Sequence, residues 1–190
     1  MGSSERFDTG PEDISPLIQT GYAVGMPPIH VWDIDSGHVQ ASSQRVYYTY
    51  SRAEASPRNI DSMVANLEDF VRASKRPVGY LLQLSAKARP PSAADRNRVT
   101  QMFNDCAYRL AGVAVVVEAE GFSGALLRSA LTTVFTISRK GFVVRIFASV
   151  KDAAGWLASS LGTEASDIVD LADDARERLK AMLSVQPIGT

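Results

Sequence analysis

Ser92 stands where an apolar segment gives way to a helical pattern, in the stretch LLQLSAKARPPSAADR (residues 81–96). It opens an S-x-x-D pattern, in which the serine hydroxyl accepts from the backbone N–H near Asp95 while the carboxylate reaches back. Such a cap stabilises a helix by about 1 kcal/mol without any other function. A phosphate is also favoured at a helix N-terminus, and Lys87 and Arg89 lie nearby in the sequence. Two interpretations stay open: a cap alone, or a cap that is also a phosphorylation and docking site.

The stretch EGFSGA (residues 120–125) departs from the G-x-S-x-G nucleophile elbow of serine hydrolases only at Ala125. An acyl-transfer serine needs a base. Both histidines, His30 and His38, precede this stretch, whereas the hydrolase order places the histidine after the nucleophile. We therefore interpret the glycines as a tight turn from strand to helix, with Ser123 as its cap, and a serine-dependent hydrolase is the least favoured function.

Neither a metal site nor a cofactor is expected. Cys106 is the only cysteine, and the histidines form no His-carboxylate cluster. The aspartates at 33 and 35, at 61 and 69, and within 167–174 lack EF-hand spacing and suit solvated faces. No G-x-G-x-x-G or Walker loop occurs, so nucleotide chemistry has no support in the sequence.

The composition is that of an ordinary globular protein, with 190 residues, 45% hydrophobic and 22% charged. Because 20 basic residues are balanced by 21 acidic ones, no net field attracts nucleic acid. The start, MGSSERFDTGPED, has no apolar core of a signal peptide, and no apolar run approaches the roughly 20 residues of a membrane span. We expect a cytoplasmic protein with no nucleic-acid partner and no integral membrane association.

Residues 29–161 show a succession of strand and helix patterns. Alternation in IHVWDID and in RVYYTYS, with a turn at Ser36-Gly37, predicts two strands that form a hairpin. Spacings of three and four predict helices over 57–77, 92–110, 121–139 and 149–161, and short apolar runs predict strands over 78–84, 112–120 and 142–149. The order β-β-α-β-α-β-α-β-α predicts an α/β fold with a mixed, mostly parallel sheet of about five strands.

Two segments flank this domain. Residues 1–28 are rich in Gly, Pro, Ser and acids and predict a flexible N-terminal arm. Residues 162–190 predict an additional amphipathic helix and a tail, with an apolar stripe from Ile168 to Leu183. That stripe has to be covered, and we expect the helix at 122–138 to cover it, within the chain or across a dimer.

The helix at 122–138 contains no acid and carries few charges. A solvent-facing helix usually has more charge, so we expect one flank to be covered. Burial within the chain, a self-association or partner face, and a lipid surface all stay open. Together with the Ser92 loop, the predicted partner-binding residues are Lys87, Arg89, Phe122, Leu126, Leu127, Arg128, Leu131 and Phe135.

Three stretches resemble the STAS domain of bacterial anti-sigma-factor antagonists, and its SpoIIAA-like branch more closely still: VGYLLQL leading to PPSAADR, GVAVVVEAEGFSGALLRSA, and GFVVRIFASVKDAAGWL. The resemblance covers about residues 29–161 and implies a regulatory protein that binds a protein partner. In that family an Asp lies near the end of the third strand, and a Ser or Thr at the next helix start is phosphorylated by a partner kinase. Gln83 and Ser92 stand at these positions, and Ala93-Ala94 replaces the family's Ser-Gly.

We therefore expect a non-catalytic cytoplasmic protein of bacterial signal transduction. It would dock on a kinase, on an anti-sigma-like regulator or on a second copy of itself, through the Ser92 loop and the helix at 122–138. Because Gln83 replaces the acid, we expect a constitutive docking loop rather than a phosphorylated one. The alternative is a small-molecule or lipid-binding sensor module of the same fold.

Overall fold

The computed structural model describes residues 27–89, 91–137 and 141–185, without the side chains of Phe122, Ser123, Ala130 and residues 133–137. Most of the predicted arm at 1–28 therefore lies outside the described residues. The elements follow in the order β1 (Ile29–Ile34), β2 (His38–Ser43), β3 (Val46–Ser51), α1 (Pro57–Ala73), β4 (Val78–Leu84), α2 (Ala93–Cys106), β5 (Leu110–Val117), α3 (Gly121–Ile137), β6 (Val143–Phe147), α4 (Val150–Leu161) and α5 (Ala165–Val185).

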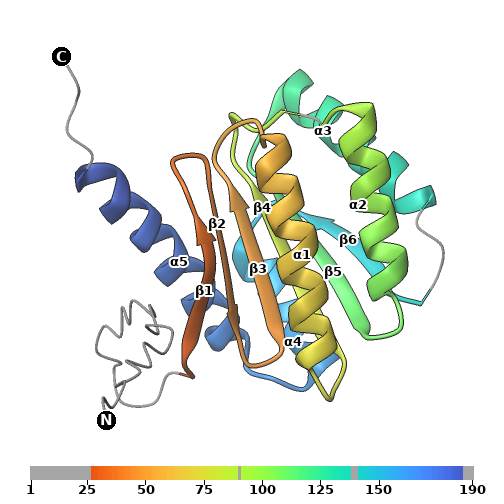
Figure 1. Cartoon of the computed structure of the whole chain (residues 1–190), viewed down its shortest axis with the longest axis vertical. Helices are drawn as coiled ribbons and strands as arrows, with labels where there is room; N and C mark the ends of the chain where they lie inside the picture. Colours follow the sequence, from red (N-terminus) through yellow and green to blue (C-terminus); the bar gives the residue numbers. More distant parts are fainter. Residues whose placement is uncertain (1–26, 90, 138–140, 186–190) are drawn as a thin grey trace, which may run out of the picture.

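One mixed sheet holds the strands in their chain order, from β1 at one edge to β6 at the other (Figure 1). β1, β2 and β3 pair antiparallel, and β3 to β6 pair in parallel. The predicted α/β class is confirmed. The sheet has six strands, however, rather than about five.

The additional strand is β2, which the sequence analysis missed. Its polar residues His38, Gln40 and Ser42 are buried, and Val39 is the only large apolar side chain between them. A strand whose buried face is polar gives little apolar alternation to detect. The predicted turn at 36–37 therefore joins β1 to β2, and not β1 to β3.

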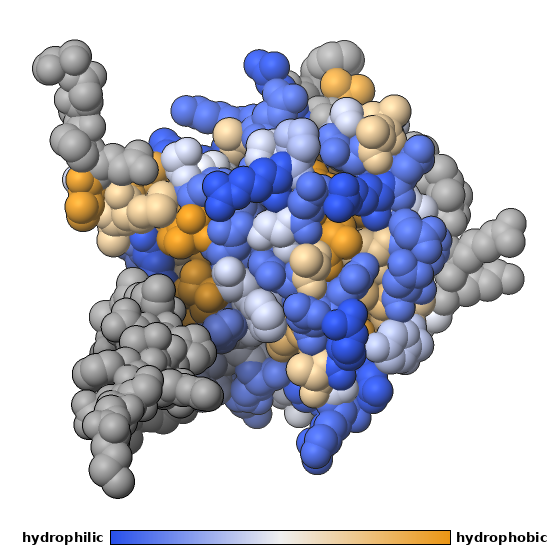
Figure 2. Space-filling view, viewed as in Figure 1, coloured by the Kyte–Doolittle hydropathy of each residue, from blue (hydrophilic) through white to orange (hydrophobic). Residues whose placement is uncertain are grey.

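Helices cover both faces of the sheet (Figure 1). α1, α2 and α3 share one face, because successive right-handed crossovers that progress in one direction along a sheet place their helices on the same side. α4 and α5 cover the other face. Figure 2 shows the outer surface on the side of α1 and α2, which is mostly hydrophilic, as expected for helices that bury only one stripe.

α5 does not pack on α3, so the predicted cover for the last helix is wrong. α4 ends at Gly162, whose left-handed φ of 65° lets the chain reverse while it stays on the same face of the sheet. α5 then buries Ile168, Leu171 and Leu179 against α4 and the antiparallel strands. The stripe is thus covered within the chain, on the face opposite α3.

The two cores differ in the size of their side chains. On the α1 to α3 face, aromatic rings follow one another across the sheet with centroids 5.5 to 6.1 Å apart. These rings are Trp32, Tyr47, Phe70, Tyr80, Phe103 and Phe142. On the opposite face, a Cβ added at Gly112 would lie 2.7 Å from the Trp156 ring. The missing side chain lets α4 approach β5 closely.

Neighbouring leucines on α3 test which side of this helix meets the sheet. Leu127 is 1% exposed, so Leu127→Ala should lower the free energy of unfolding by about 2 to 5 kcal/mol through lost burial and a cavity. Leu126 is 51% exposed, and Leu126→Ala should change it by no more than about 0.5 kcal/mol. Urea unfolding of both variants gives the comparison. Equal losses would show that α3 packs differently.

Candidate functional site

The β4–α2 loop, which carries the predicted docking residues, is fixed to the neighbouring β3–α1 loop. The Ser85 hydroxyl donates to the carbonyl of Arg52 over 2.6 Å. Nη1 of Arg89 lies 3.7 Å from a carboxylate oxygen of Glu54. The side chains of Lys87 and Arg89 are exposed. The start of the loop is therefore held at Ser85, and the cations of Lys87 and Arg89 are exposed beyond the carboxyl ends of the parallel strands.

Ser92 is the N-cap of α2, so the predicted cap is confirmed. Its hydroxyl accepts from the Asp95 N–H over 3.2 Å and donates to a carboxylate oxygen of Asp95 over 2.6 Å. Ser56 caps α1 and Ser149 caps α4 in the same way, each accepting from the third residue of its helix. Ser92 is thus one of three similar caps, and it is exposed to solvent. Its phosphorylation stays a prediction.

Gln83 does not join Ser92. Its side chain is 1% exposed and points to the α5 face, whereas α2 lies on the other face. The Tyr48 hydroxyl donates to Oε1 of Gln83 over 2.6 Å, and Nε2 of Gln83 donates to Glu118. Burial raises the pKa of Tyr48, which keeps the hydroxyl protonated as a donor. An amide fits here because it accepts and donates at once, whereas a carboxylate would meet Glu118 as a like charge.

The predicted docking residues on α3 separate into two groups. Leu127 and Leu131 are buried in the core of the chain itself, so they are not available at a surface. Leu126 is exposed, and Arg128 donates to the carbonyl of Ala119 over 3.2 Å. The predicted residues Phe122 and Phe135 belong to α3, but their side chains lie outside the described part.

The glycines of EGFSGA shape the entry into α3. Gly121 has a left-handed φ of 60°. A Cβ at Gly124 would lie 2.2 Å from the carbonyl oxygen of Ala119, so only glycine fits there. The predicted tight turn is confirmed, while the side chain of Ser123 lies outside the described residues.

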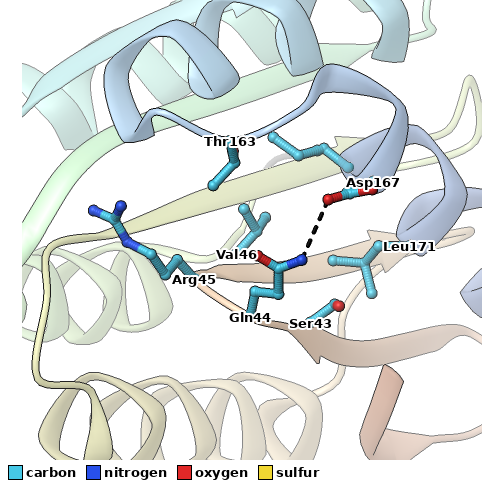
Figure 3. A pocket seen from close by; sticks show the side chains of 8 residues that line it. Ser43, Gln44, Arg45, Val46, Thr163, Asp167 and Leu171 are labelled. Atoms are coloured by element: carbon cyan, nitrogen blue, oxygen red, sulfur yellow. Dashed lines mark hydrogen bonds between the residues drawn. The ribbon is translucent and has the colours of Figure 1, made fainter. Parts of the chain in front are cut away.

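A small hollow lies between the β2–β3 turn and the start of α5. Nε2 of Gln44 donates to Asp167 over 3.2 Å across it, and Arg45 and Thr163 line its sides (Figure 3). The space measures about 10 Å³, no more than one water-sized group. The hollow is too small for an organic ligand.

A larger hollow of about 240 Å³ lies between the C-terminal ends of α1 and α2. Polar side chains line much of it, among them Glu68, Arg72 and Tyr108, and the buried Cys106 lies at its base. Burial raises the pKa of the Cys106 thiol to about 12, so the thiol stays protonated and weakly nucleophilic. If the chain is a small-molecule-binding sensor module, this hollow is where the ligand would bind.

A partly buried polar network that the predicted site did not include lies where β1, β2, β3 and α1 meet. We call it the His38 network; its members are Asp33, Asp35, His38, Gln40, Tyr47, Asn59, Ser62 and Asn66. His38 is 2% exposed. Its Nδ1 lies 2.8 Å from the Asn59 amide nitrogen and 3.3 Å from a carboxylate oxygen of Asp35. Its Nε2 lies 2.6 Å from the Gln40 amide nitrogen.

The rest of the network orients Gln40. Its carbonyl oxygen accepts from the Tyr47 hydroxyl and, over 3.1 Å, from Asn66. The Ser62 hydroxyl donates to Asp33 rather than to His38, so it is not arranged as a nucleophile with a histidine base. The network joins side chains of α1 to those of the antiparallel strands and so fixes the helix on them.

A sequence signal for this network existed. Asn59, Ser62 and Asn66 are spaced by three and four residues, which places them on one face of α1. The same helix also carries an apolar stripe, which gives the stronger periodic signal. The polar face of α1 and the alternating polar residues of β2 together predict that this helix packs on this strand.

Comparison with protein-family models, with curated proteins and with solved structures gives no match for this chain. No helix in the described part is long and apolar enough to cross a membrane. Within residues 27–89, 91–137 and 141–185, no group of three or more His, Cys, Asp or Glu side chains is arranged to hold a metal ion.

Asp35 makes the His38 network sensitive to acid. Burial opposes ionisation of its carboxyl. Hydrogen bonds from the Gly37 N–H, from Asn59 and from His38 outweigh burial and lower the pKa of Asp35 below its usual range. A carboxyl with a lowered folded-state pKa stabilises the fold above its unfolded pKa, and this contribution is lost as pH falls through the folded value.

Asp35→Asn should therefore flatten the acid side of the stability curve. Wild-type protein should lose unfolding free energy as pH falls below about 4, and the variant should lose less. At pH 7 the variant should be about 1 to 2 kcal/mol less stable, because charge-assisted hydrogen bonds become neutral ones. Urea unfolding at several pH values measures both effects, with the exposed Glu164→Gln as control. Parallel curves for wild type and Asp35→Asn would contradict the prediction.

Proposed function

We propose that this chain is a non-catalytic regulatory protein that docks on a protein partner through the β4–α2 loop. One observation carries the proposal: the Ser85 hydroxyl holds the start of this loop on the Arg52 carbonyl while Lys87 and Ser92 stay exposed. A loop held at one end loses less conformational entropy on binding than a free one, which favours docking. The partner is a kinase, an anti-sigma-like regulator or a second copy, and the setting is the cytoplasm.

The proposal includes kinship with the STAS domain, in a diverged SpoIIAA-like form. The three stretches that resemble the family supply β4, β5 and β6 with the helices or helix starts that follow them. The alternating order from β3 to α4 supports the assignment. α5 has no counterpart in the stretches that carry the resemblance.

The contacts of Ser92 favour docking without phosphorylation. Its hydroxyl donates to the carboxylate of Asp95, so a phosphate at this position would face a like charge. Arg89 is already paired with Glu54. Gln83 is engaged on the other face of the sheet and offers Ser92 no acid. The loop is therefore proposed to dock constitutively.

Substitutions at Ser92 separate its cap from its docking role. Ser92→Ala should lower the free energy of unfolding by about 1 kcal/mol, and Ser92→Asp by less, because a carboxylate also caps. Ser149→Ala, at the matched cap of α4, should cost a similar amount. Urea unfolding measures all three. A Ser92→Ala variant as stable as wild type would show that the cap contributes nothing.

Docking is tested by a photo-crosslinking side chain at position 87, introduced into the full chain in its own host cells. A discrete crosslinked protein should appear, persist with Ser92→Ala and with Ser149→Ala, and weaken with Ser92→Asp through repulsion and desolvation. The same probe at the exposed Arg58 on α1 is the control. An undiminished product with Ser92→Asp would refute the docking role of Ser92. Substantial phosphate at Ser92 in native protein would restore the kinase-driven mechanism.

A further inference from the structure

The two edges of the sheet are built differently. β1 carries a register irregularity between Val31 and Asp33, and acidic side chains stand within and just after the strand. Bulges and charges of this kind prevent another strand from adding to an exposed edge. The β1 edge is therefore protected against strand pairing.

β6 has no register irregularity and no acidic side chain. It pairs with β5 in unbroken register from Val143 to Phe147, and the strand order ends with it. Its sequence, VVRIF, contains four apolar residues and a single charge, Arg145. Among the described residues, no strand pairs with its outer side. A regular apolar edge of this kind is a template for an added strand.

The α4-facing side chains of β6 resemble the centre of a protein interface. Val143, Arg145 and Phe147 alternate onto this face. Val143 is 55% exposed. The guanidinium carbon of Arg145 lies 5.4 Å from the Trp156 ring centroid, and the Phe147 ring lies 5.7 Å from the same ring. Trp, Arg and Phe are enriched in such interfaces, and the stacking holds Arg145 in place at the strand.

We propose that β6 binds an extended segment of a partner protein as a seventh strand, with an acidic side chain opposite Arg145. Because strand side chains alternate, residues two positions before and after this acid would lie over Val143 and Phe147 and should be apolar. Main-chain hydrogen bonds would supply affinity, and the acid would set register and specificity. This surface belongs to the last strand and is separate from the Ser92 loop.

Charge decides against a second copy as the occupant. In a symmetric antiparallel pair of β6 strands, the central residue Arg145 would face Arg145 of the other copy. Like charges directly opposite each other are destabilising, and a shift of register would shorten an already short strand pair. A heterologous strand that carries an acid meets no such repulsion.

Short random peptides displayed on phage and selected against the full chain test this inference. Enriched peptides should alternate apolar residues around Asp or Glu, and binding should slow amide hydrogen exchange in residues 143–147. Arg145→Glu should weaken these peptides about tenfold or more and favour Lys or Arg at the central position. The affinity of Arg145→Gln for these peptides should lie between those of wild type and Arg145→Glu. Arg58→Glu on α1 should leave the affinity unchanged. Thermal melts of each variant show that it stays folded.

Three results would overturn the inference. The first is a selection in which no peptides with alternating apolar residues around Asp or Glu are enriched. The second is peptide binding that Arg145→Glu leaves unchanged. The third is a wild-type dimer that Val143→Asp dissociates, which would assign the edge to a second copy. Crosslinking from position 87 reports on the Ser92 loop alone, so the two surfaces succeed or fail separately.

Discussion

Arg45 holds the start of β4 beside β3, where the antiparallel half of the sheet meets the parallel half. Its Nε donates to the Pro77 carbonyl over 2.8 Å, and its Nη1 donates to the Leu161 carbonyl at the end of α4. Its own carbonyl accepts from the Gly79 N–H over 2.8 Å. These bonds fix where β4 starts beside β3. A slip of one residue there would exchange the two faces of β4, because strand side chains alternate.

Polar pairs near the other end of the strands support the same register. Tyr48, Gln83 and Glu118 come from three adjacent strands or their ends and meet only in this register. The Ser85 hydroxyl then reaches the Arg52 carbonyl and anchors the β4–α2 loop. A buried polar group without its partner destabilises the fold by roughly 1 to 3 kcal/mol. Each alternative register would leave several polar groups unpaired and would therefore be less stable. The polar pairs therefore make the sheet specific as well as stable.

Local signals in the sequence predicted local structure well. The cap at Ser92 needs only the four residues up to Asp95, and the turn into α3 needs only Gly121 and Gly124. The face chosen by α5 depends instead on a reversal at Gly162 and on the space left over β2 and β3, which no short pattern encodes. The His38 network was not predicted for the same reason, since its members come from β2, β3, α1 and the end of β1, and only the fold brings these four segments together.

α3 links the two proposed surfaces. It follows the turn at Gly121, near the end of β5, and leads directly into β6. Among its described side chains, Leu127 and Leu131 are the apolar ones that reach the core. Val144 and Ile146 of β6, on the same face of the sheet, are partly buried. An added strand would extend the sheet under this helix and give these side chains further neighbours. A bound strand would thus add to the burial of Val144 and Ile146.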